Sequence, residues 1–191
     1  MIDWPLARRV AGVVAGDPAR GRPRPQLQEV AAESERLVSA YTGLHPPAPL
    51  PAPELLSRAE WIDVNHASMA ELLDPAVARI GEGMGPAGAL MRTGAGMLVA
   101  AELGVLTGYM SQRVLGQYEL VILDPDSPSR LLFVAPNLDQ AAGQLGASDD
   151  ELLRWVALHE VTHALQFAGV PWLRPHPVSY THLTLPTTPY V

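Results

Sequence analysis

The segment from Ser148 to Gly169 constrains the fold more than any other part of the chain. Its apolar residues recur with helical spacing, which predicts a helix over residues 148–168. Ser148 is a natural N-cap, and Glu151 follows three residues later, as a capping box requires. Gly169 supplies a stop signal, and Pro171 follows it. The rest of the chain must therefore pack around one long, well-delimited helix.

An HExxH motif lies inside this helix, at His159, Glu160 and His163. Residues four apart share one helix face, so both imidazoles can reach a single ion. Zn²⁺ accepts neutral imidazole nitrogen and is the expected cofactor. Glu160 can accept a proton from zinc-bound water and pass it to a leaving amine. The motif predicts two metal ligands and a catalytic base. An amphipathic helix with solvated histidines is the alternative.

The third metal ligand is not evident from the sequence. Gln166 and Gly169 occupy the positions where a metzincin needs glycine and histidine, which excludes that class. No aspartate or glutamate follows Glu160, so the later glutamate of a gluzincin is also missing. His176, between two prolines, is one candidate. We expect instead that the ligand lies in a C-terminal part of the protein that this sequence does not include.

Composition excludes several other functions. The 191 residues include no cysteine, which rules out disulfides, thiolate metal sites and cysteine nucleophiles. The net charge of −7 argues against a nucleic-acid binder. The longest apolar stretch, Met97–Met110, is shorter than the roughly 18 to 20 residues that span a bilayer. The N-terminus does not resemble a signal peptide. We expect a cytoplasmic protein with no nucleic-acid or membrane partner, and the oligomeric state is left open.

Most of the remaining chain also has helical patterns. Helices are predicted over residues 1–16, 26–43 and 54–74, and in a segment of up to about 20 residues that ends at Leu115. Residues 45–53 hold five prolines in nine positions and predict an extended linker. The glycine-rich residues 81–96 are interpreted as a loop. Gly83–Gly88 match GxGxxG, but no clear strand precedes them, so a dinucleotide site is disfavoured.

Two segments have the composition of strands. Residues 118–124 and 130–135 are rich in Val, Leu and aromatic side chains, and a turn-forming sequence separates them. They predict a hairpin, and a short helix over residues 138–145 follows it. The fold class is therefore α+β and mostly helical, with a small hairpin or sheet before the HExxH helix.

Three stretches together resemble one known family. They read RVLGQY at 113–118, FVAPN at 133–137 and LHEVTHALQFAGVPWLRPH at 158–176. They are similar to the zincin-like metallopeptidase type 2 family, whose members are often described as associated with deazaflavin-coenzyme biosynthesis. The resemblance implies a zincin-like fold and zinc-dependent hydrolysis of a peptide or a small amide. By analogy with zincins, residues 130–135 would lie along the cleft and offer an edge to a peptide.

The end of the chain differs from the rest. Residues 178–187, VSYTHLTLPT, resemble the in-frame translation of a sequencing adaptor. We therefore predict a partial zincin-like domain over 1–177 and a non-native tail over 178–191. Family members are also longer than this chain, which agrees with a C-terminal truncation. A genuine disordered tail is the alternative.

Four other residues carry weaker signals. His66 could reach a site from another helix, but a capping or surface role is preferred. Tyr109 and Tyr118 could stabilise an oxyanion, but core packing is preferred for both. Trp155 is expected to pack beneath the metal site. Two alternatives to a peptidase stay open: a non-catalytic metal-binding or scaffold protein, and an amidohydrolase of a small molecule.

Overall fold

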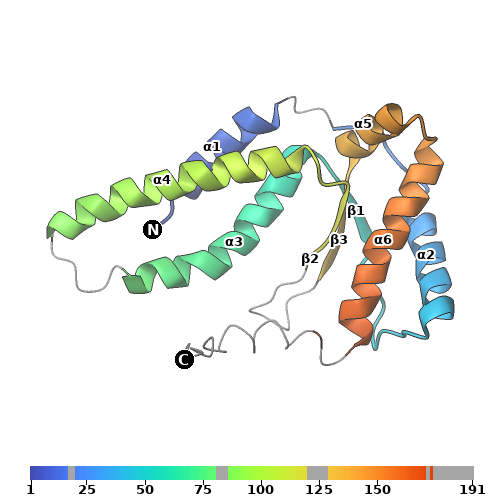
Figure 1. Cartoon of the computed structure of the whole chain (residues 1–191). Helices are drawn as coiled ribbons and strands as arrows, with labels where there is room; N and C mark the ends of the chain where they lie inside the picture. The colour runs from blue at the N-terminus through green and yellow to red at the C-terminus, as the bar shows by residue number, and fades with distance from the viewer. Residues whose placement is uncertain (17–19, 81–85, 120–128, 171–172, 174–191) are drawn as a thin grey trace, which may run out of the picture.

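The computed structural model describes residues 1–16, 20–80, 86–119, 129–170 and 173 (Figure 1). Six helices and three strands follow one another in these ranges. They are α1 Trp4–Ala15, α2 Leu27–Thr42, β1 Pro53–Leu56, α3 Arg58–Ile80, α4 Pro86–Ser111, β2 Gly116–Glu119, β3 Arg130–Val134, α5 Ala135–Leu145 and α6 Asp149–Gly169. The predicted class, α+β and mostly helical with a small sheet before the HExxH helix, is confirmed.

The three strands form one sheet in the order β1-β3-β2. β2 pairs antiparallel to β3, with Gly116 opposite Phe133. The predicted pairing is confirmed at Tyr118 and Glu119, while residues 120–124 of the predicted strand lie outside the described residues. β1 pairs parallel to the other side of β3, with Pro53 opposite Leu131. The central strand is therefore β3. The expectation that residues 130–135 present an open edge is wrong, because β3 has a neighbour on both sides.

Helices cover both faces of the sheet (Figure 1). Leu131 and Phe133 of β3 are buried against α2, α5 and α6. Leu132 and Val134, which point to the opposite face, are buried against α1 and α3. A strand that is buried on both faces reads as a continuous apolar run, as RLLFV does. The HExxH helix is therefore held on one face of the sheet by the main apolar core.

Strand β1 is absent from the sequence prediction, which placed residues 54–56 in a helix. Leu55 and Leu56 fit the apolar side of either element, and the local pattern does not separate the two. The strand forms because β3 offers it an edge, with Glu54 opposite Leu132. That contact joins residues far apart in sequence. Residues 43–52, most of the predicted linker, form neither helix nor strand.

Helix α4 is longer than predicted, and two glycines in its C-terminal half pack closely against α1. A Cβ on Gly104 would lie 2.5 Å from the Ala7 carbonyl oxygen, and one on Gly108 would lie 2.6 Å from that of Ala11. The missing side chains let α1 and α4 approach closely. The helix begins at Pro86, inside the glycine-rich segment that the sequence predicted to be a loop. Helix α3 also extends beyond residue 74, its predicted end, and continues through Pro75 to Ile80.

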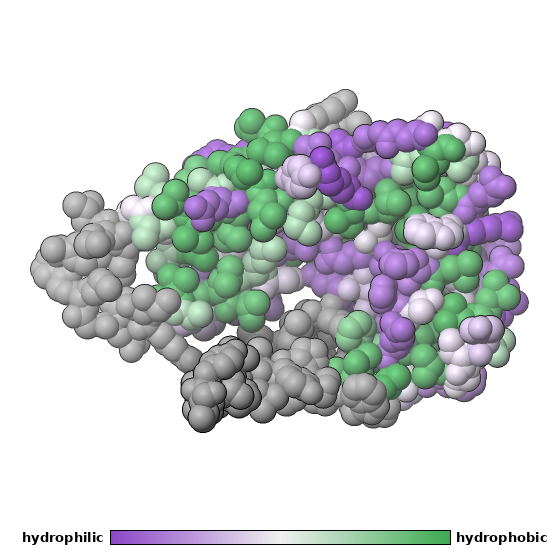
Figure 2. Space-filling view, viewed as in Figure 1, coloured by the Kyte–Doolittle hydropathy of each residue, from purple (hydrophilic) through white to green (hydrophobic). Residues whose placement is uncertain are grey.

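The side of α4 that does not pack on α1 carries apolar side chains that face solvent. Figure 2 shows them over the region of α4. The exposed members in its C-terminal half are Val105, Leu106, Tyr109 and Met110. No helix within the described part of the chain is both long enough and apolar enough to cross a membrane.

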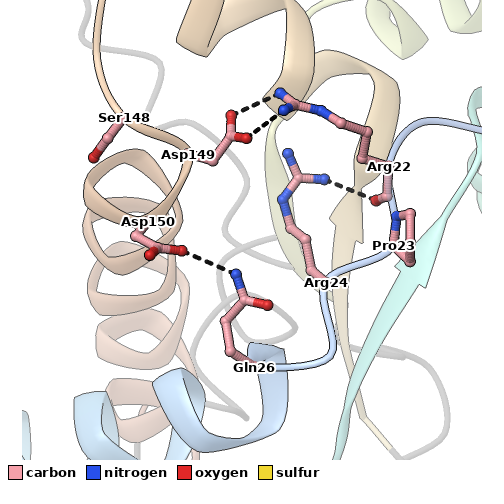
Figure 3. A pocket seen from close by; sticks show the side chains of 7 residues that line it. All are labelled: Arg22, Pro23, Arg24, Gln26, Ser148, Asp149 and Asp150. Atoms are coloured by element: carbon pink, nitrogen blue, oxygen red, sulfur yellow. Dashed lines mark hydrogen bonds and ion pairs between the residues drawn. The ribbon is translucent and has the colours of Figure 1, made fainter.

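An ionic network ties the segment before α2 to α5 and α6. Figure 3 shows its contacts with Asp149 and Asp150 at the start of α6. Arg22 donates to Asp149 at 2.7 Å and also pairs with Asp139. Arg24, which is almost fully buried, donates to Asp139 at 2.7 Å. Gln26 donates to Asp150 at 3.0 Å across a small cavity of about 360 Å³. These contacts fix the start of α6 relative to the core.

Candidate metal centre

Helix α6 begins where the capping box places it. The Glu151 amide donates to the Ser148 hydroxyl, and the Glu151 carboxylate accepts from the Ser148 amide at 3.2 Å. From Asp149 the helix runs without interruption to Gly169, within one residue of the predicted ends. Its apolar side packs on α2, α5 and β3. The HExxH segment is therefore regular helix on a fixed support.

His159 and His163 converge on one point. Their Nε2 atoms lie 3.2 Å apart, and their rings are perpendicular at 4.7 Å between centroids. Two nitrogens bound tetrahedrally to one zinc at about 2.0–2.1 Å would lie roughly 3.3–3.4 Å apart. The observed separation therefore fits two ligands of a single ion. His159 is exposed and His163 is partly buried, which leaves this side of the helix accessible.

Glu160 is turned toward the sheet and is buried. Burial raises the pKa of its carboxyl above the usual value, and charge on His159 and His163 acts in the opposite direction. The backbone amide of Tyr118 donates a hydrogen bond to the carboxylate and also lowers the pKa. A carboxylate held beside two converging imidazoles has the surroundings of a proton-transfer group.

Strand β2 packs directly against the Glu160 side chain. A Cβ on Gly116 would lie 2.6 Å from Glu160 Cγ and 3.0 Å from its Oε1. No larger residue fits there unless Glu160 moves. Gly116 is not among the site residues predicted from the sequence. The available signal was its place in the RVLGQY stretch, which belongs to the family resemblance.

Trp155 flanks the histidine pair. Its ring stacks on the His159 ring, with centroids 5.8 Å apart and an interplanar angle of 14°. The expectation that it packs beneath the site is wrong, because its side chain is 62% exposed. The i, i+4 spacing brings the two rings together, but this stripe of α6 faces solvent rather than the sheet. The stacking restricts the His159 ring from one side.

The other weakly signalled residues lie in different places. His66 is buried at the junction of α1, α3 and α4, where its Nε2 lies 2.8 Å from the Thr107 hydroxyl. Its predicted capping or surface role is wrong. Tyr109 is 51% exposed, so core packing is wrong for it too. Tyr118 stacks on Phe167 of α6, as a packing residue would.

A third ligand is not found within the described ranges. No group of three or more histidine, cysteine or acidic side chains converges there. His176, the candidate from the sequence, lies outside the described residues, as does the tail 178–191. Gly83 and Gly85 of the GxGxxG match also lie outside them. Pro86–Gly88, the rest of that match, begin helix α4.

Comparison with known proteins agrees with this geometry. A model of the zincin-like metallopeptidase family matches residues 2–182. The chain belongs to the zincin-like metallopeptidase family. A crystal structure from Chloroflexus aurantiacus, provisionally described as a hydrolase with a novel fold, is similar to it with a TM-score of 0.71 and 32% identity. The alignment covers 94% of this zincin-like chain, which spans 57% of the other protein's length. No curated protein matches the chain.

Proposed function

We propose that this zincin-like protein is a zinc-dependent hydrolase of peptide or amide bonds. The observation that carries the proposal is the 3.2 Å separation of the His159 and His163 Nε2 atoms beside the buried Glu160. The two imidazoles would hold the ion. Bound zinc supplies an acidified water and a Lewis acid for the carbonyl oxygen.

Glu160 performs the proton transfers in this proposal. Its carboxylate accepts a proton from the attacking water as the water oxygen bonds to the carbonyl carbon. The same carboxyl then gives that proton to the amide nitrogen as the carbon–nitrogen bond breaks. The products are a carboxylic acid and an amine, so the proton count balances.

The proposed substrate is a peptide or a small amide, and we propose that its hydrolysis takes place in the cytoplasm. The exposed Trp155 ring beside His159 gives the site an apolar flank that is open to solvent. The side chains described around the histidines do not distinguish the two substrate classes. The two classes are therefore compared by experiment.

The test compares wild type with Glu160→Gln. Zinc content is measured by mass spectrometry, and hydrolysis is measured with fluorescent casein and with a mixture of N-acyl amino-acid amides. We expect Glu160→Gln to keep the zinc of the wild type and to lose turnover by about 10²- to 10⁴-fold, the typical contribution of a general base. Glu102→Gln, at an exposed position on α4, is the matched control and should behave as wild type.

The possible outcomes separate the alternatives. Cleavage of casein supports a peptidase, and cleavage of the amide mixture alone supports a small-molecule amidohydrolase. Bound zinc without hydrolysis of either probe favours the non-catalytic metal-binding protein. Full turnover by Glu160→Gln would overturn the role of Glu160.

A further inference from the structure

The outer edge of β2 carries backbone groups that the sheet does not use. Leu115 and Val134 form a hydrogen-bonded pair, with the Val134 amide donating to the Leu115 carbonyl at 3.0 Å. Opposed pairs alternate in an antiparallel ladder, so the next pair, Gly116 with Phe133, is not hydrogen-bonded. The same holds for Tyr118 with Leu131. The amides of Gly116 and Tyr118 therefore point away from β3.

Glu160 occupies the space beside this edge. The Tyr118 amide donates to its carboxylate. The position where Gly116 lacks a side chain is filled by Glu160 Cγ, Cδ and Oε1, all within 3.0 Å of a Cβ built there. The Tyr118 ring, on the same face as Gly116, stacks on Phe167 with centroids 6.3 Å apart. Two separate contacts thus join β2 to α6 on this face of the sheet.

We propose that Gly116 and the Tyr118 amide are positioning residues for Glu160. Gly116 provides the room for the Glu160 side chain, and the Tyr118 N–H fixes its carboxylate. A glutamate side chain has three rotatable bonds. If the protein already holds the carboxylate in its reactive orientation, little side-chain conformational entropy is lost in reaching the transition state. The inference rests on the proposed function and adds the residues that orient its general base, Glu160.

The inference also concerns how a substrate can bind. A peptide that adds to a sheet needs free amides and carbonyls along an edge strand. At Tyr118 the outward amide is already bonded within the protein. We therefore expect this edge of β2 to orient Glu160 rather than to pair with a substrate strand at Tyr118.

The first experiment is a double-mutant cycle between Gly116→Ala and Glu160→Asp. The added methyl should push the Glu160 carboxylate aside and lower kcat at least tenfold, with KM and zinc content unchanged. The shorter aspartate makes room for that methyl. We therefore expect Glu160→Asp to cost at least threefold less in the Gly116→Ala background than in wild type. Additive effects would overturn the inference.

A stability cycle tests the contact without using activity. Gly116→Ala should lower the melting temperature in wild type and leave it unchanged in a Glu160→Ala background, where the clash is gone. Equal shifts in both backgrounds would overturn the inference. Coupling in stability combined with no hydrolysis by wild type would instead overturn the proposed function, and the catalytic role with it. Gly143→Ala, where a Cβ meets nothing within 4 Å, is the matched glycine control.

The amide is tested separately at Tyr118. Tyr118→Ala removes the ring that stacks on Phe167 and keeps the N–H, whereas Tyr118→Pro removes both. Because this N–H is not used by the sheet, proline costs no ladder hydrogen bond there. We expect kcat of Tyr118→Pro to fall at least fivefold below that of Tyr118→Ala at equal zinc content. Equal kcat values would show that the amide does not position the base.

Discussion

At the scale of single residues, Arg24 is the clearest buried charge away from the candidate metal centre. Its side chain is 4% exposed and donates to Asp139 at 2.7 Å. Burial acts to raise the pKa of Asp139, but the Arg22 amide and the Arg24 guanidinium outweigh it and hold that pKa below its usual value. The pair therefore stabilises the fold whenever Asp139 is ionised.

Asp139→Asn tests this pair. It leaves Arg24 buried beside a neutral group and should lower the free energy of unfolding by about 2 kcal/mol at pH 7. A lowered carboxyl pKa stabilises the folded state above the unfolded value of about 3.9, and this is lost as pH falls through the folded pKa. The difference between variant and wild type in urea unfolding should therefore shrink at pH 3. An equal difference at both pH values would contradict the account. Asp150→Asn, in the same network but exposed, should cost about 0.5 kcal/mol or less.

At the scale of elements, the close contact between α1 and α4 depends on glycine. Gly104→Ala would place a methyl 2.5 Å from the Ala7 carbonyl oxygen. We expect it to lower the free energy of unfolding by roughly 1–3 kcal/mol, the usual cost of overpacking. Gly94→Ala, on the same helix with nothing within 4 Å, should be neutral or stabilising by up to about 1 kcal/mol. Similar effects of the two substitutions in chemical denaturation would contradict the packing described.

The elements that were predicted well are those with local signals. The ends of α6 follow from the Ser148–Glu151 capping box and from Gly169, all within the helix itself. Strand β1 was missed because its pairing is non-local, and the first part of α4 was missed because its glycines favour a loop when only the local sequence is considered. Glu54 pairs with Leu132, and Gly104 and Gly108 of α4 pack on the backbone of α1. A pattern read along the chain contains neither contact.

At the scale of the whole molecule, the sheet lies between two layers of helices, and the site lies where β2 meets α6. The sequence could predict the candidate site residues His159, Glu160 and His163, because all three lie on one helix and their spacing fixes their relative positions. Gly116 and Tyr118 could not be predicted, because they reach Glu160 only through the tertiary contact of β2 with α6. The family match over residues 2–182 and the similar structure from Chloroflexus aurantiacus support this arrangement as a shared fold.

The central claim is that His159 and His163 hold one zinc ion. The most direct measurement is X-ray absorption at the zinc edge of the protein loaded with one equivalent of Zn²⁺. The account predicts a shell with at least two imidazole nitrogens at about 2.0–2.1 Å, and the loss of one of them in His163→Ala. A spectrum without imidazole scattering, or one that is the same in wild type and His163→Ala, would contradict it.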